Sequence, residues 1–250
     1  MKEFSISSVS KLFTASPDRE VIALDGIDLK IRAEEFVCIL GPTGCGKTTL
    51  LRIIAGLENP TSGQILQDGE SVSHAHEFCT LVFQQYSLFP WLNVHENVSF
   101  PMEMKGVSRQ ERTMKAKELL ELVGLTGVEK AQTYELSGGM QQRVAIARAL
   151  AHDPEILLMD EPFGALDERT RNRLQKILLD IWQKKCKTVI FVTHNIDEAI
   201  YLADRIIVMT TEPGRIAEEL KVNLPRPRQR LGEEFTKLHL KIRKILEDSA

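Results

Sequence analysis

A glycine-rich stretch near the start of the chain has the residue types and the spacing needed to hold phosphate groups. Residues 41–48, GPTGCGKT, fit the pattern GxxxxGK[ST]. Glycines let the backbone curl so that successive N–H groups face an anion, and a following helix adds its positive end. The Lys47 ammonium could then reach the terminal phosphates, and the Thr48 hydroxyl could bind Mg²⁺. We therefore expect a nucleotide site that includes Gly41, Pro42, Thr43, Gly44, Cys45, Gly46, Lys47, Thr48 and Thr49.

Two adjacent acidic residues, Asp160 and Glu161, follow an apolar run at residues 156–159. Ligands of open α/β sheets bind at the carboxyl ends of the strands. We expect Asp160 to hold the metal, directly or through water, and Glu161 to polarise a water molecule toward the γ-phosphate. Without the glycine-rich stretch, two acids that simply end a strand would be the first interpretation.

Strands and helices must position these residues, and the hydrophobic pattern predicts where they lie. Continuous apolar runs, typical of parallel strands covered on both faces, occur at residues 36–40, 156–159 and 188–193. Residues 27–32 alternate between apolar and charged side chains, which predicts an antiparallel-type strand. Helices are predicted from Ser108 to about Leu125 and from Ser137 to about His152. This alternation of strands and helices predicts an α/β core.

The motif LSGGMQQR, at residues 136–143, lies shortly before the acidic strand. Together with the glycine-rich stretch, it resembles the nucleotide-binding subunit of an ATP-binding cassette (ABC) transporter. The family signature is usually written LSGGQ, so Met140 departs from it at the last position. Further matches are Gln84, the run GALD at residues 164–167, and His194. The resemblance covers nearly the whole chain.

The resemblance implies the fold and the domain organisation of an ABC ATPase. That fold is an α/β P-loop NTPase core with a parallel central sheet, an antiparallel β subdomain and a helical signature subdomain. Residues 1–224 would form the ABC ATPase domain, in which a RecA-like core carries the helical subdomain at about 86–155. Residues 225–250 would form a short C-terminal extension.

The resemblance also implies that the cofactors are ATP and Mg²⁺, and it gives individual residues a role in hydrolysis. Gln84 would approach Mg²⁺ and the attacking water, and His194 would contact the γ-phosphate. With Glu161, these are the expected catalytic residues. Thr48, Gln84 and Asp160 are the expected metal-binding residues.

The resemblance also implies a head-to-tail dimer in which both subunits contact each nucleotide. Ser137 would cap a helix, and with Gly138 and Gly139 it would face ATP held by the other subunit. Asp167, in the GALD run, belongs to the same expected nucleotide site. Phe13 is the best-placed residue to stack on adenine, although core packing would also explain an N-terminal phenylalanine.

Cys45 lies inside the glycine-rich stretch, beside the start of the predicted helix. A helix N-terminus stabilises a thiolate, so we expect an accessible, reactive thiol that ATP protects. The alternative, with equal weight, is a small residue that merely fills space.

Apolar residues follow Gln84 directly in what should be a loop, and they suggest a docking surface: Leu88, Phe89, Trp91 and Leu92. In ABC transporters this region receives a coupling helix of the membrane-spanning permease. We therefore expect Phe89 or Trp91 at the permease surface. Local packing against the helical subdomain would account for some of these residues.

Finer features look like the nitrate, sulfonate and taurine importer branch: LFPW at 88–91, EPFGALD at 161–167 and PGR at 213–215. This resemblance implies an ATPase that drives solute uptake from the cytoplasmic face of the cell (inner) membrane, as a peripheral subunit. Its expected partners are a second copy or a homologous ATPase subunit, the permease subunits and, indirectly, an extracytoplasmic solute-binding protein. The alternative is a soluble ABC ATPase with a non-transport partner.

Composition fits a globular chain and argues against a nucleic-acid-binding protein. The 250 residues are 43% hydrophobic, enough for a sizeable core. A net charge of −3 gives no global positive field, so we expect no nucleic-acid partner. His74, His76 and Cys79 are close in sequence but lack an acidic partner set, so no metal cluster is expected there. The basic run at 226–230 is expected to be a solvated tail.

Overall fold

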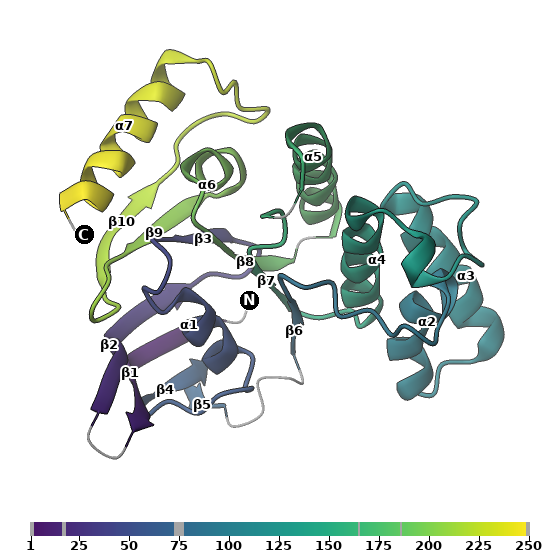
Figure 1. Cartoon of the computed structure of the whole chain (residues 1–250), viewed down its shortest axis with the longest axis horizontal. Coiled ribbons are helices and arrows are strands. Elements are labelled where there is room, and N and C mark those ends of the chain that lie inside the picture. Colours follow the sequence, from purple (N-terminus) through teal and green to yellow (C-terminus); the bar gives the residue numbers. More distant parts are fainter. Residues whose placement is uncertain (1–2, 17–18, 73–77, 165, 186, 249–250) are drawn as a thin grey trace. The chain divides into compact units, whose positions relative to one another are not determined.

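The computed structural model describes residues 3–16, 19–72, 78–164, 166–185 and 187–248 (Figure 1). The chain forms two compact units, one of residues 1–79 with 187–250 and one of residues 80–186. Among the described residues, no helix combines the length and the hydrophobicity that crossing a bilayer requires. His74 and His76 lie outside the described residues.

An antiparallel sheet in the first unit has the strand order β2-β1-β4-β5. These strands are β1 (Phe4–Ser16), β2 (Arg19–Ile31), β4 (Ser62–Gln67) and β5 (Glu70–Ser71). Strand β1 pairs antiparallel with β2, and the register places Phe4 opposite Ile31 and Ile6 opposite Leu29. All four of these side chains are buried, so the alternating pattern at residues 27–32 is confirmed as an antiparallel strand with one buried face.

A second sheet in the first unit carries the strand order β10-β9-β3-β8. Its strands are β3 (Phe36–Leu40), β8 (Thr188–Thr193), β9 (Arg205–Met209) and β10 (Ile216–Lys221). Strand β3 pairs parallel with both β8 and β9, and β10 pairs antiparallel with β9. Every residue of β3 and β8 is buried, as expected for parallel strands covered on both faces.

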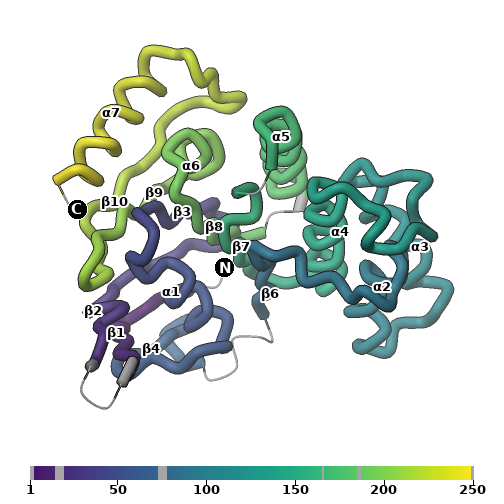
Figure 2. Tube along the Cα trace, in the orientation of Figure 1, coloured from purple at the N-terminus to yellow at the C-terminus, as the bar shows by residue number. Residues whose placement is uncertain are grey.

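Helices of the first unit are α1 (Lys47–Ile54), α6 (Ile196–Leu202) and α7 (Glu233–Asp248). Figure 2 follows the chain from β9 through β10 and on to α7. Helix α7 contacts α6 and β9, and it buries Phe235 and Ile242. The basic run before α7 is not a solvated tail, which corrects that expectation: Arg228 is buried and donates hydrogen bonds to backbone carbonyls.

In the second unit, β6 (Cys79–Val82) neighbours β7 (Ile156–Asp160). The helices are α2 (Val94–Met104), α3 (Arg109–Leu122), α4 (Gly138–Ala151) and α5 (Glu168–Lys185), with a 3₁₀ turn at Thr133–Glu135. Helices α2, α3 and α4 pack together, and α4 contacts α5. Ser108 and Ser137 cap α3 and α4, so both predicted helices begin where their capping residues indicate.

Candidate nucleotide-binding site

The glycine-rich loop lies between β3 and α1, as its sequence predicts. Helix α1 begins at Lys47, and Gly46 precedes it with a φ of 88°. Lys47 is only 5% exposed, and its Nζ donates to the carbonyls of Gly41 at 2.9 Å and Pro42 at 2.8 Å. These bonds hold the ammonium group at the loop itself, within reach of a phosphate bound by the loop N–H groups.

Two glycines of this loop have no room for a side chain. A Cβ on Gly46 would lie 2.6 Å from the carbonyl oxygen of Ala23 and from a methyl carbon of Leu24. A Cβ on Gly41 would lie 2.6 Å from the Cys45 sulfur. The loop conformation is therefore fixed by packing against β2 and by its own sulfur atom, which leaves its N–H groups preorganised for an anion.

Cys45 is fully buried, which contradicts the expected accessible, reactive thiol. Burial raises the pKa of the Cys45 thiol, and this effect outweighs the opposing charge of Lys47. The thiol therefore stays protonated at neutral pH. The alternative interpretation fits: Cys45 is a small side chain that packs against Gly41 inside the loop.

His194 follows the last residue of β8 and is exposed. The residues on either side of it are fixed by hydrogen bonds. The Thr193 hydroxyl donates to Glu198 Oε2 at 2.6 Å, and it accepts from the backbone N–H of Asn195 at 3.0 Å. Asn195 caps α6 by accepting from the Glu198 N–H at 3.1 Å. His194 therefore stands at a rigid junction between strand and helix.

Phe13 lies in β1, opposite Val21 of β2, and its side chain is 40% exposed. The Lys11 ammonium lies 5.0 Å from the centroid of its ring. Phe13 is thus not a core residue, and an exposed aromatic ring is the kind of surface on which adenine stacks.

The two acidic residues of the second unit lie at the carboxyl end of β7, as predicted. Asp160 ends the strand and is 8% exposed. Glu161 is half-buried and has a φ of 42°, a backbone conformation uncommon for a residue with a side chain. Such strain concentrates at functional sites. A turn follows, in which the Gly164 N–H donates to the Glu161 carbonyl at 3.2 Å.

The signature motif forms the start of α4. Ser137 is exposed, and its hydroxyl accepts from the Met140 N–H at 3.4 Å. A Cβ on Gly138 would lie 2.7 Å from the Tyr86 hydroxyl, and one on Gly139 would lie 2.6 Å from a methyl carbon of Thr170. Both glycines are therefore required by packing, whatever they bind.

Asp167 is exposed and precedes α5. It accepts from the Thr170 N–H at 3.0 Å, and this hydrogen bond holds the pKa of the Asp167 carboxyl below its usual value. Asp167 therefore has a structural role as a helix cap, in addition to any contact with nucleotide.

Three residues that the sequence did not single out organise the segment after Gln84. Arg148 of α4 donates to the Ser87 carbonyl at 2.8 Å, and its guanidinium lies 5.2 Å from the ring centroid of Phe89. Tyr86 contacts Gly138, as described above. Asn97 of α2 is fully buried and bonds the backbone around Phe89. No helix is predicted from the sequence at residues 94–104, so no signal in it points to Asn97.

The apolar segment itself is partly packed and partly exposed. The Phe89 ring packs against Phe100 at 4.8 Å and Trp91 at 5.4 Å between centroids. Trp91 is nevertheless 72% exposed, and Gln84 is exposed as well. Local packing therefore accounts for Phe89, and Trp91 remains an exposed apolar surface.

Each unit carries part of the expected site. The first unit contains the glycine-rich loop, His194 and Phe13, and the second contains Gln84, Asp160, Glu161, Ser137, Gly138, Gly139 and Asp167. A glycine-rich loop between a buried parallel strand and a helix, with an acidic strand end and a capped signature helix, defines an ATP-binding cassette.

Comparison with known proteins gives the family. The sequence profile of the ABC transporter family matches residues 24–164, and the chain belongs to this family. It has the ABC ATPase fold and is an ATPase of this class. A dimeric ATP-binding cassette solved in a post-hydrolysis state with ADP and Pi matches with a TM-score of 0.80 and 35% identity, over 88% of this chain and 99% of that chain.

Several curated relatives span nearly the whole chain. An uncharacterized ABC transporter ATP-binding protein of Methanocaldococcus jannaschii is 54% identical, covering 98% of this chain and 92% of the relative. The aliphatic sulfonates import ATP-binding protein of Bacillus cereus is 48% identical, with 95% and 93% covered. The nitrate import ATP-binding protein of Synechocystis is 47% identical, with 88% and 82% covered.

Proposed function

We propose that this chain is the ATP-hydrolysing subunit of an importer for small oxyanionic solutes of the nitrate, sulfonate and taurine type. The observation that carries the proposal is the segment after Gln84. It follows a residue expected at Mg²⁺ and the attacking water, it includes the exposed Trp91, and Arg148 ties it to the signature helix. One segment thus connects the nucleotide to a surface suited to a permease. The importer names of close relatives support the solute class.

In the proposed mechanism, the loop N–H groups and Lys47 bind the β- and γ-phosphates of ATP. Thr48, Asp160 and Gln84 would hold Mg²⁺, which supplies charge neutralisation at the phosphate oxygens when bound. Glu161 would accept a proton from the attacking water. His194 would donate a hydrogen bond to the γ-phosphate as negative charge develops there.

Two chains would bind head to tail, each completing the other's site. The exposed hydroxyl of Ser137 lies at the N-terminus of α4, where a helix favours an anion, and it would face ATP held by the partner. Phe13 would stack on the adenine of ATP bound in its own chain. The permease and an extracytoplasmic solute-binding protein complete the proposed importer, with this chain peripheral on the cytoplasmic side of the membrane.

The catalytic part of the proposal is tested by Glu161→Gln. Removal of a general base typically lowers kcat by about 100-fold or more, while ATP binding remains. We expect this variant to form a stable dimer with ATP and Mg²⁺, measured by light scattering after size-exclusion chromatography. Glu118→Gln, on the surface of α3, is the matched control. Wild-type hydrolysis by Glu161→Gln would show that Glu161 is not the base.

The transport part is tested by identifying what binds the chain in its native membranes. We would extract a tagged chain with mild detergent and expect a polytopic membrane protein in near-stoichiometric amount. Trp91→Glu should abolish this association and leave the ATPase activity of the isolated chain within about twofold, because Trp91 is exposed. Leu240→Glu, an exposed apolar residue of α7, is the control. Soluble partners alone would support the non-transport alternative.

A further inference from the structure

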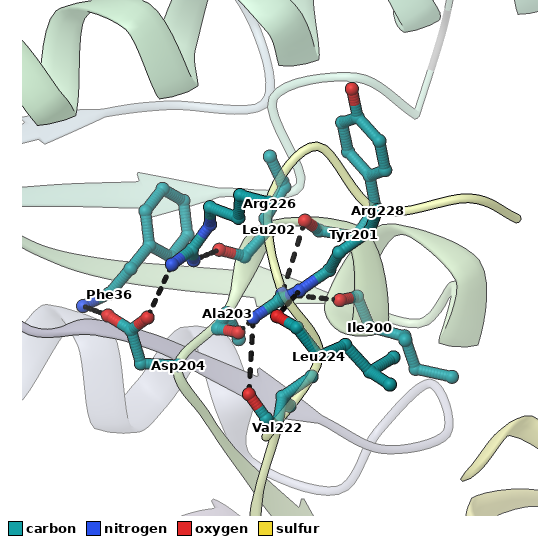
Figure 3. Close-up of polar contacts among 10 residues, drawn as sticks. All are labelled: Phe36, Ile200, Tyr201, Leu202, Ala203, Asp204, Val222, Leu224, Arg226 and Arg228. Atoms are coloured by element: carbon teal, nitrogen blue, oxygen red, sulfur yellow. Dashed lines mark hydrogen bonds and ion pairs between the residues drawn. The ribbon is translucent and has the colours of Figure 1, made fainter. Parts of the chain in front are cut away.

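The C-terminal end of α6 is held by two arginines of the segment that follows β10 (Figure 3). The last four carbonyls of a helix lack partners within the helix. Arg228 Nη1 donates to three of these carbonyls, those of Ile200 at 2.6 Å, Tyr201 at 3.2 Å and Ala203 at 2.6 Å. Arg226 donates to the fourth, that of Leu202. We call Arg226 and Arg228 the α6 clamp.

Arg228 is buried and bonds the backbone on both sides of its guanidinium group. Its Nε donates to the Leu224 carbonyl and its Nη2 to the Val222 carbonyl, both at 3.3 Å, and the residue is 7% exposed. Burial, and next the charge of Arg226, lowers the pKa of Arg228 to about 10, so the guanidinium stays charged at neutral pH. The C-terminal end of a helix carries a partial negative charge, which stabilises the positive charge of Arg228 at this position.

Arg226 connects the α6 clamp to the central sheet. It donates to Asp204 Oδ1 at 2.6 Å, and Asp204 Oδ2 accepts from the Phe36 N–H at 3.0 Å (Figure 3). Phe36 is the first residue of β3, the strand that leads into the glycine-rich loop. The α6 clamp therefore fixes the end of α6 against the same strand that carries the phosphate site.

The opposite end of α6 begins two residues after His194. The helix has seven residues, so its two ends are only about 10 Å apart. The buried pair of Thr193 and Glu198 joins the first turn to β8. Because α6 is this short and its first turn is joined to β8, we expect a displacement of its C-terminal end to reach the backbone that carries His194.

We propose that Arg228 is a positioning residue for His194: by bonding the last carbonyls of α6, it fixes the helix whose start places the imidazole at the γ-phosphate. The C-terminal segment is then part of the hydrolytic machinery through its bonds to α6. This inference rests on the catalytic role proposed for His194. It concerns turnover, because Arg228 bonds carbonyls of α6 and of the segment after β10, whereas Lys47 bonds the glycine-rich loop itself.

The test compares Arg228→Gln with Arg243→Gln in the full chain. Arg243 is an exposed arginine of α7 paired with Glu247, so its loss removes the same charge from the same end of the chain. Nucleotide stoichiometry and Kd are measured with a fluorescent ATP analogue, and kcat and KM with MgATP. The position of the imidazole is followed by the His194 NMR resonance, assigned with His194→Gln.

We expect Arg228→Gln to lower kcat roughly 10- to 100-fold, the effect of a misplacement of about 1 Å, with unchanged stoichiometry and KM. The His194 resonance should move, while Arg243→Gln should leave both kcat and the resonance as in the wild type. Should Arg228→Gln fail to fold, Arg228→Lys and Arg226→Gln replace it. Each keeps part of the α6 clamp, so each should give a smaller loss of kcat and a displaced His194 resonance.

A wild-type kcat in Arg228→Gln, an unmoved His194 resonance, or a loss of nucleotide binding parallel to that of kcat would overturn the positioning role. The variant His194→Gln separates this failure from that of the proposed function. If His194→Gln keeps the wild-type kcat, the catalytic role of His194 is wrong and the positioning role falls with it. If His194→Gln loses activity and the Arg228 and Arg226 variants do not, only the positioning role is wrong.

Discussion

Asn97 holds the segment proposed to meet the permease, and its replacement by Leu should release that segment. The Asn97 Oδ1 accepts from the Phe89 N–H at 2.9 Å. Its Nδ2 donates to the carbonyls of Phe89, Leu92 and Asn93 at 3.0 to 3.1 Å. Leu has nearly the same shape as Asn, so the substitution removes four hydrogen bonds while it creates little empty space.

The expected loss of free energy of unfolding depends on which of the backbone groups bonded by Asn97 keep another hydrogen-bond partner. The Phe89 carbonyl also accepts from the Leu92 N–H, and the Asn93 carbonyl also accepts from the Asn97 backbone N–H. Among the described residues, the Phe89 N–H and the Leu92 carbonyl bond the Asn97 side chain and have no such second backbone partner. Both hydrogen bonds are part-buried, so the cost of leaving the two groups unsatisfied is at most that of fully buried groups, about 1–3 kcal/mol each or about 2–6 kcal/mol together. Local opening of the segment restores contact with water and favours the lower part of this range.

Urea unfolding and amide hydrogen exchange measure the two parts of this effect. We expect Asn97→Leu to lower the free energy of unfolding by about 2–3 kcal/mol and to speed exchange of the Phe89 amide by about 30-fold or more. Ser99→Ala is the matched control, because Ser99 is buried on the same helix and its hydroxyl bonds only a carbonyl within that helix. Wild-type stability with an equally protected Phe89 amide would refute the anchoring role.

Three further predictions concern the phosphate loop and the second unit. Gly214→Ala should lower ATP affinity at least about tenfold by equilibrium binding, because a Cβ there would clash with the Cys45 carbonyl. Gly26→Ala also strains the backbone, at a φ of 62°, but its Cβ meets open space, so ATP affinity should stay as in the wild type. The Cys45 thiol should resist iodoacetamide at pH 8 until urea unfolds the chain, since burial raises its pKa; rapid labelling of the native chain, located by peptide mass spectrometry, would contradict this. Burial lowers the pKa of His152, which shares a 2.8 Å hydrogen bond with Thr80, so the unfolded chain binds the proton more tightly. Stability should therefore be complete above the unfolded pKa of about 6.5 and decline as pH falls toward the folded value, and urea midpoints at low and neutral pH should differ less in His152→Gln.

The hydrophobic pattern and the capping residues predicted β3, β7, β8, α3 and α4 because each of these elements relies on local information. The runs that became β3, β7 and β8 are buried at every position, and Ser137 marked the start of α4 by a hydrogen bond that spans three residues. Spacing alone also placed the glycine-rich loop, since a phosphate site of this kind is contiguous in sequence.

The errors came from residues whose environment is set by distant parts of the chain. Cys45 has the local setting of a reactive thiol, but folding buries it, and desolvation reverses the direction of its pKa shift. Arg226 and Arg228 look like a polar tail next to proline, but they bond the Asp204 carboxylate, 22 residues away, and carbonyls at the end of α6 that lie 24 to 28 residues away in sequence. The hydrophobic pattern of a sequence does not show which distant side chain will bond the unpaired carbonyls at a helix end.

Three polar side chains of this chain bond the backbone near the site. Asn97 bonds the segment after Gln84, Arg148 bonds the same segment from α4, and Arg228 bonds the end of α6. Each of these contacts is directional, so it fixes one backbone conformation where apolar packing would tolerate several. The segments they hold are those expected to carry the γ-phosphate contacts and the permease surface.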